Sequence, residues 1–112
     1  MTNNGIVELR VYKLKPGTAE AFAGRFREQI SPMLERHGVD VVHYGPSLAD
    51  PDSFCLIRAY RSVEERQAKL DAFYGSSEWL EQHDDAVMAM IDSYNTCVVP
   101  AEAITGFSAG RP

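Results

Sequence analysis

Two long amphipathic stretches, separated by segments with strand-like alternation, constrain the fold of this chain more than any other feature. Apolar residues recur every three or four positions along residues 19–37, which is typical of a helix with one buried face. Pro32 lies inside this pattern, so we expect a kink there or a break before Ser31, because proline removes a backbone donor. Gly38 is a good stop for this helix.

The second amphipathic stretch begins at residues 62–65, Ser-Val-Glu-Glu, a spacing in which the serine caps a helix. Residues 74–77 interrupt it, and Ser76 or Ser77 can cap a further helix that carries Trp79. Runs of alternating apolar and polar residues, or of β-branched residues, flank both stretches. They predict four strands, at residues 6–14, 39–44, 53–61 and 94–99.

This order of elements predicts an α+β domain with ferredoxin-like βαββαβ topology. We expect a four-stranded antiparallel sheet with the helices on one face. In our interpretation residues 1–100 form this single domain, because a chain of 112 residues has room for one core. Residues 101–112 form a C-terminal tail that is either loose or packed on a neighbour.

Neither face of the predicted sheet is polar, which indicates a partner on the face without helices. On the third strand Cys55, Ile57 and Ala59 point one way, and the residues that point the other way include Leu56 and Tyr60. A solvated face would not normally carry so many apolar side chains. We therefore expect a homodimer in which two sheets pack face to face.

Charge and sequence pattern limit the partners and the compartment. The net charge of −5 argues against nucleic acid and against an anionic membrane surface, since both need basic patches. No apolar run approaches the roughly 20 residues of a membrane span, and residues 1–5 do not resemble a signal peptide. We expect a cytoplasmic protein, in which Cys55 and Cys97 are buried structural thiols.

Three short motifs resemble the NIPSNAP-like family and occur in that family's order and spacing. They are VELRVYKLKPG at residues 7–17, LIRAYRSVEER at residues 56–66 and AFYGSSEW at residues 72–79. The resemblance covers residues 6–100 and implies a dimeric α/β barrel. It implies no single reaction, because such dimers include cofactor-free monooxygenases, haem-degrading enzymes, isomerases, dehydratases and stress-response proteins.

Polar residues on the first and third strands form one candidate site. Side chains two positions apart share a face, so Glu8, Arg10 and Tyr12 can meet Arg58 and Tyr60 on the neighbouring strand. An arginine there could hold a carboxylate or an enolate, and a tyrosine could donate to an oxyanion. Alternatively, a glutamate–arginine pair fixes an interface and has no chemistry.

The three histidines, His37, His43 and His83, are candidate acids or bases. We expect His83 to project towards the helix–sheet cleft, one turn after Trp79, where it could also be an axial haem ligand. No two histidines have the spacing of a metal motif, so we expect no metal site. We also expect no cofactor, except that His83 keeps haem binding as an alternative.

Five aromatic residues complete the candidate set, because ligand sites are concave and mostly apolar. The alternative is that they only fill the core. These ligand-binding candidates are Phe22, Phe26, Phe73, Tyr74 and Trp79.

Three functions are compatible with these residues. The first is a NIPSNAP-like homodimer of unassigned biochemical role that binds a small apolar or aromatic metabolite in the helix–sheet cleft. The second is an enzyme, a cofactor-independent monooxygenase or an isomerase, with His83 or His43 as base and Arg10 or Arg58 as anion holder. The third is an interaction module without a pocket.

Overall fold

The chain alternates strands and helices in the order that its hydrophobic pattern indicates. The structure is a computed structural model and describes residues 5–105. Its elements are β1 (Ile6–Leu14), α1 (Ala19–Arg25), the π-helical turn η1 (Phe26–Ile30), α2 (Ser31–Arg36), β2 (Asp40–Pro46), β3 (Ser53–Tyr60), α3 (Val63–Tyr74), α4 (Ser77–Gln82), α5 (Asp84–Met90), β4 (Ile91–Pro100) and α6 (Glu102–Thr105).

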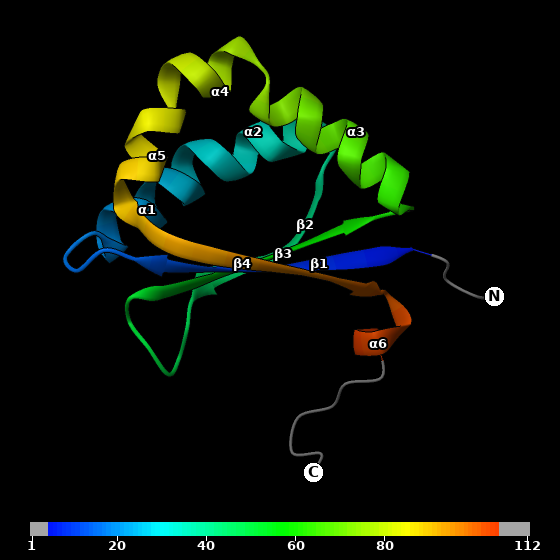
Figure 1. Ribbon diagram of the computed structural model, residues 1–112, viewed down its shortest axis with the longest axis horizontal. Coiled ribbons are helices and arrows are strands. Elements are labelled where there is room, and N and C mark those ends of the chain that lie inside the picture. Colours follow the sequence, from blue (N-terminus) through cyan, green and yellow to red (C-terminus); the bar gives the residue numbers. More distant parts are fainter. Residues whose placement is uncertain (1–4, 106–112) are drawn as a thin grey trace.

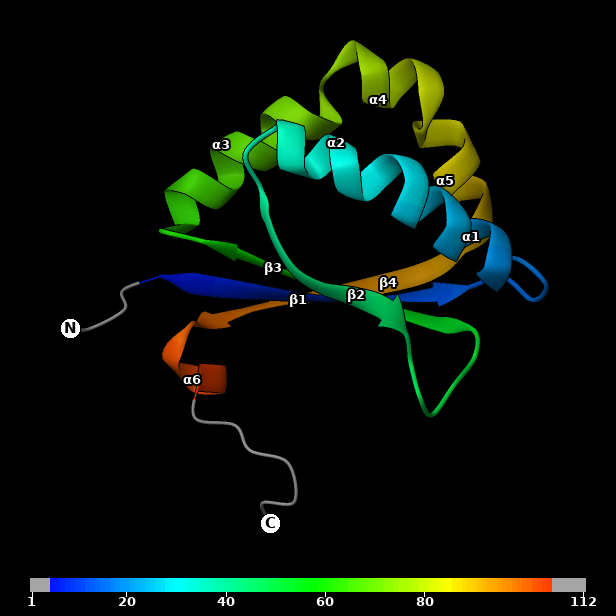
Figure 2. The ribbon, with the colours of Figure 1, turned by 180° about the vertical axis from the view of Figure 1, so that it is seen from behind.

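The four strands form one sheet in the order β2-β3-β1-β4, and every neighbouring pair is antiparallel. Helices α1 to α5 cover one face of this sheet, while the short α6 lies on the other side (Figure 1). Seen from behind, α1 and α2 pass over the β2 side of the sheet (Figure 2), and α5 contacts β4. The predicted α+β, ferredoxin-like fold is confirmed.

Strand alternation sorts the side chains of the sheet between its two faces. On β3, Phe54, Leu56, Arg58 and Tyr60 are buried beneath the helices, and the residues between them are half-buried on the open face. The predicted interpretation of both cysteines as buried thiols is wrong, because Cys97 is exposed and Cys55 is only partly covered. Both belong to the positions of β3 and β4 that point away from the helices.

The first long helix does not break before Ser31, as we had considered, but widens through the π-turn η1. The Ser31 N–H donates to the carbonyl of Phe26, five residues back, so the wider turn comes immediately before Pro32. Pro32 then occupies the first turn of α2, where a backbone donor is not needed. The helical path therefore continues through the proline.

Helix ends follow the expected local chemistry. Gly38 adopts φ 74°, and the N–H of Val39 donates to the Leu34 carbonyl, which closes a Schellman motif. Ser62 Oγ accepts from the Glu65 N–H at 3.0 Å, and Ser76 Oγ accepts from the Trp79 N–H at 3.2 Å. Both predicted serine caps are confirmed.

Two boundaries in the last third of the chain differ from the sequence expectation. The helix that carries Trp79 is divided at His83, which ends α4 and precedes α5. Strand β4 begins at Ile91 instead of Tyr94, because Leu14 of β1 pairs with Ile91 across an irregular step. The predicted tail includes α6, and its Phe107 lies outside the described residues.

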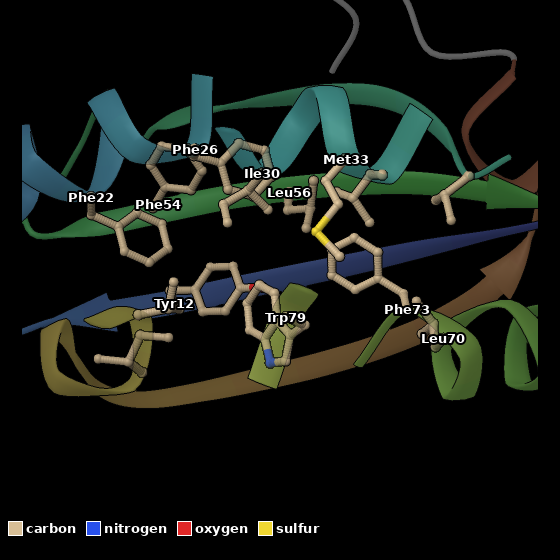
Figure 3. Packing of buried hydrophobic residues seen from close by; sticks show 14 of the residues in the cluster. Tyr12, Phe22, Phe26, Ile30, Met33, Phe54, Leu56, Leu70, Phe73 and Trp79 are labelled. Carbon is tan, nitrogen blue, oxygen red and sulfur yellow. The ribbon is translucent and has the colours of Figure 1, made fainter. Parts of the chain in front are cut away.

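The core fills the layer between the sheet and the helices. Aromatic rings dominate it: Phe22 packs edge-on against Phe54 at 5.0 Å, and Phe26 lies 5.3 Å from Phe54. Figure 3 shows these three rings gathered at one end of the layer, away from Phe73. Among residues 5–105, no helix combines the length and the apolar character that a membrane crossing requires.

Truncating Phe73 should destabilise the fold strongly. Its side chain is fully buried, and its ring lies 4.8 Å from Tyr74 and 5.3 Å from both His37 and Trp79. We expect Phe73→Ala to lower the free energy of unfolding by about 3–5 kcal/mol, measured by urea denaturation. The exposed Leu48 offers the control: Leu48→Ala should stay within about 0.5 kcal/mol of the parent protein. Equal losses in the two variants would contradict this description of the core.

Candidate functional site

A cleft of about 600 Å³ lies between the sheet and helices α3, α4 and α5. Strands β1 and β4 supply its lining residues on the sheet side. Its wall is mixed: aromatic and aliphatic side chains, among them Tyr12, Leu70, Tyr74, Trp79, Val87 and Tyr94, share it with charged and polar ones. The volume is that of a small-molecule site.

Charged side chains converge on one carboxylate beside this cleft. Glu8 of β1 is fully buried, and its Oε1 accepts from Arg58 Nε at 2.5 Å. Its Oε2 accepts from Nε and Nη2 of Arg66 at 2.8 and 2.6 Å, and Arg10 Nη2 lies 3.4 Å away. Three guanidinium groups, from β1, β3 and α3, thus surround a single carboxylate; we call Glu8, Arg10, Arg58 and Arg66 the arginine cluster.

Strand register explains why the first part of this cluster forms. Glu8 pairs directly with Arg58 across β1 and β3, so both side chains point towards the helices. Arg10 is two positions further along β1 and shares that face. Arg66 reaches the same carboxylate from α3, one helical turn before the buried Leu70.

The hydroxyl of Tyr74 completes the polar part of the site. It accepts a hydrogen bond from Arg58 Nη1 at 3.2 Å and another from Arg10 Nη1 at 3.3 Å. A tyrosine hydroxyl has two acceptor positions and one hydrogen. With both acceptor positions used by arginines, the hydrogen of Tyr74 is available to an acceptor in the cleft.

Burial and charge set the protonation of the cluster. Burial raises the pKa of Glu8, but the hydrogen bond and the charge of Arg58, together with Arg10 and Arg66, outweigh it, so the net pKa lies below the ordinary value. Burial raises the pKa of Tyr60, whose hydroxyl lies 3.5 Å from Glu8, to about 12. At neutral pH Glu8 is ionised and Tyr60 is neutral.

A second, much smaller cavity of about 20 Å³ lies between the sheet and the helices, with residues of α1, η1 and α2 in its lining. Arg58 lines it, together with Phe22, Phe26 and other core residues. Nη2 of Arg58 is the one buried side-chain nitrogen or oxygen among residues 5–105 that has no hydrogen-bond partner. Tyr12, Tyr74, Trp79 and Val87 line both cavities and form the wall between them.

The structure brings together most of the predicted strand residues. Arg10 and Tyr12 line the large cleft, and Arg58 lies behind its wall. Tyr60 is buried against Glu8 and lines neither cavity. Burial raises the pKa of Tyr12 well above its ordinary value, so its hydroxyl stays protonated.

The histidines lie elsewhere. His83 is buried, but its Nδ1 lies 3.0 Å from Arg25 Nη1, and it lines neither described cavity, contrary to our expectation that it faces the cleft. Burial and the charge of Arg25 lower its pKa. His43 pairs with Ile57 and therefore belongs to the open face of the sheet, and His37 packs on Phe73. This placement gives no support to a catalytic base or a haem ligand at the cleft.

The five aromatic candidates divide between the core and the site. Tyr74 and Trp79 line the large cleft, whereas Phe22 and Phe26 line the small cavity and Phe73 is enclosed in the core. Within the described residues, no three side chains of histidine, cysteine, aspartate or glutamate are placed to hold a metal ion.

Arg66 is the residue that sequence reasoning missed. The pattern of α3 contained a signal, because Arg66, Leu70 and Phe73 have the spacing of one helical face. A charged residue inside such a stripe needs a partner of opposite charge when the face is buried. Glu8, which strand alternation places on the helix-covered face, is that partner.

Replacing Glu8 should weaken the fold and change its response to acid. Because the folded-state pKa of Glu8 is depressed, its stabilisation is present above the unfolded pKa and is lost as the pH falls through the folded pKa. We expect Glu8→Gln to lower the free energy of unfolding by about 3–5 kcal/mol at about pH 7. Urea denaturation from about pH 7 to about pH 3 should show a smaller acid-induced loss in Glu8→Gln than in the parent protein.

Glu65 provides the control for this experiment. It also accepts from basic side chains, Arg61 and Lys69, but these pairs lie on the surface of α3. Glu65→Gln should therefore cause a much smaller loss than Glu8→Gln. A Glu8→Gln protein with parental stability at neutral pH would show that the arginine cluster does not hold the fold.

Comparison with solved structures places this chain among known folds. A NIPSNAP family protein from Agrobacterium tumefaciens superposes with a TM-score of 0.83 at 17% identity, covering 96% of this chain and 92% of that one. An uncharacterised NIPSNAP-like domain protein from Burkholderia xenovorans gives 0.81 at 18% identity, covering 99% and 91%. A candidate antibiotic biosynthesis monooxygenase from Nitrosomonas europaea gives 0.65 at 18% identity, covering 95% and 98%.

At these identities the structural likeness shows the fold alone. No functionally curated protein matches the sequence. The sequence profile of the NIPSNAP family matches residues 7–103, which is most of the chain. The protein belongs to the NIPSNAP family.

Proposed function

We propose that this protein is a homodimer that binds a small apolar or aromatic metabolite in the large cleft. The observation that supports this most is the form of the cleft, about 600 Å³ in volume, with aromatic and aliphatic side chains beside convergent polar groups. Arg10, Arg66 and Tyr74 supply those polar groups. An interaction module without a pocket would have no need of such a cleft.

The open face of the sheet supports the dimer. Cross-strand pairing places Leu9 beside Ile57 on one side and Cys97 on the other, and Val11 beside Cys55. Val11 is 47% exposed, although it belongs to the inner strand β1, on the face of the sheet that carries only the short α6. A second copy packed on this face would remove the apolar surface from water.

The enzyme alternative has weaker support. Likeness to the candidate monooxygenase from Nitrosomonas europaea is a likeness of fold. Neither His83 nor His43, the bases that we considered, lines the cleft. Ligand binding therefore explains the observed groups with fewer assumptions than turnover does.

A cytoplasmic location agrees with the state of the cysteines. Cys55 and Cys97 form no disulfide, and both are on the open face of the sheet. A reducing compartment keeps thiols in this form. We propose the cytoplasm on this basis.

Indole should bind in the cleft beside Trp79 and Tyr94, which both line it. Tyr94→Ala removes an aromatic part of the wall, and we expect the affinity for indole to fall by roughly three- to tenfold in a calorimetric titration. Leu80→Ala, a change of a similarly exposed residue outside the cleft lining, should leave the affinity unchanged. Saturable binding that is indifferent to Tyr94→Ala would place indole elsewhere.

Light scattering coupled to gel filtration should give twice the chain mass of 12.5 kDa. Val11→Lys introduces a charge into the proposed interface, so we expect this variant to elute as a monomer. Val63→Lys makes the same change at a comparably exposed position on α3, and we expect that variant to remain dimeric. A monomeric parent protein, or a dimer that survives Val11→Lys, would reject the sheet-to-sheet interface.

A further inference from the structure

We infer that the ligand of the large cleft is a monoanion, a small aromatic carboxylate, whose carboxylate binds Arg10, Arg66 and the hydroxyl of Tyr74. This inference rests on the proposed function, because it names the chemical class of the molecule that the cleft takes. It is carried by the balance of charge in the arginine cluster and by the donors that the cluster leaves unused.

The arginine cluster has more positive charge than its own carboxylate can neutralise. Three guanidinium groups contact Glu8, and the exposed fractions of their side chains are only 12% for Arg10, 0% for Arg58 and 19% for Arg66. Cations removed from water to this degree are costly unless an anion compensates them. One carboxylate compensates one of the three charges.

Glu8 has no capacity for a further donor. Its Oε2 already accepts from two nitrogens of Arg66 and is approached by Arg10, and its Oε1 accepts from Arg58, with the Tyr60 hydroxyl at 3.5 Å. Each carboxylate oxygen offers about two acceptor positions. Besides Glu8, the hydroxyls of Tyr74 and Thr96 accept from the cluster, and both are neutral. A further negative charge for the cluster must therefore come from another molecule.

The unused donors of the site face the cleft. Arg66 lines the cleft, and its Nη1 forms no hydrogen bond with residues 5–105, while its Nε and Nη2 are engaged by Glu8. Tyr74 lines the cleft as well, and its acceptor positions are both occupied by arginines, which leaves its hydrogen to donate. Arg10 is a third lining residue; its Nε donates to Thr96 Oγ1 at 3.0 Å, and its Nη1 and Nη2, which contact Tyr74 and Glu8, each carry a second hydrogen. A group that only accepts, such as a carboxylate, matches this set.

Two acids on the helix side of the cleft limit the ligand to one negative charge. Asp71 and Asp84 are both lining residues. Asp71 accepts from Gln67 Nε2 at 2.8 Å, and Asp84 accepts from Trp79 Nε1 at 3.0 Å, so neither contacts the arginine cluster through these bonds. A second carboxylate on the ligand would meet their negative charge. The aromatic walls, including Trp79 and Tyr94, favour a flat ring for the remainder of the ligand.

A matched set of three compounds tests the charge directly. Indole-3-acetate, indole-3-acetamide and tryptamine share the indole ring and differ in carrying a negative, no or a positive charge. In calorimetric titrations, we expect the acetate to bind the unmodified protein at least tenfold more tightly than the acetamide. We expect tryptamine to bind most weakly of the three.

Arg66→Gln tests the assigned donors without removing the partner of Glu8, because Arg58 still pairs with that carboxylate. The variant should lose roughly tenfold or more in affinity for the acetate and retain the parental affinity for the acetamide. Arg27→Gln is the matched control, since Arg27 is exposed and pairs only with its neighbour Glu28. It should behave as the parent protein does.

The outcomes separate the inference from the proposed function. Equal binding of acetate and acetamide, or a preference for tryptamine, would overturn the monoanion while leaving the apolar cleft as a ligand site. An acetate preference that survives in a folded Arg66→Gln would overturn the assignment of Arg66. Failure of all three compounds and of indole to bind would reject the proposed function and the inference with it. The comparison of the three compounds uses only the unmodified protein. It therefore tests the inference even if the Arg66→Gln variant does not fold.

Discussion

The interaction on which this structure depends most is the buried contact between Glu8 and three arginines. It joins β1 to β3 through Arg58 and joins the sheet to α3 through Arg66. A buried ion pair is weak evidence for stability by itself, because desolvation offsets much of the attraction. Once both partners are buried, however, neither can be removed without leaving the other uncompensated. The position of α3 over the sheet is tied to this contact, and α3 forms one wall of the cleft.

The same contact connects the architecture with the proposed activity. Glu8 holds the guanidinium groups in place, and those groups hold the hydroxyl of Tyr74 at the wall of the cleft. The polar part of the site is therefore positioned by strand register and does not depend on a flexible loop. Rigid strands and helices hold a binding geometry more closely than loops do, because their backbones are fixed by hydrogen bonds. Glu8 neutralises one of the three arginine charges. The positive charge that remains favours a negatively charged hydrogen-bond acceptor in the ligand.

Local features were predicted well because their causes are local. The stop at Gly38 and the caps at Ser62 and Ser76 depend on a few neighbouring residues, and all three appear in the structure. The pairing of Glu8 with Arg58 followed from strand alternation and the order of strands. The surroundings of His83 were predicted less well: it is buried on the same stripe as Trp79, but its Nδ1 contacts Arg25 of α1 and not the cleft. Arg66 was missed because its partner lies 58 positions away along the chain.

The sequence by itself determined the ferredoxin-like order of elements, the two faces of each strand and the membership of the NIPSNAP family. These properties follow from periodicity and short motifs, which act over a few residues. Only the tertiary structure decided that three arginines share one carboxylate, that Tyr74 accepts from two of them, and that no histidine lines the cleft among the described residues. Those facts depend on the distance and tilt between packed elements, which are set by the volumes of the aromatic side chains between the sheet and the helices.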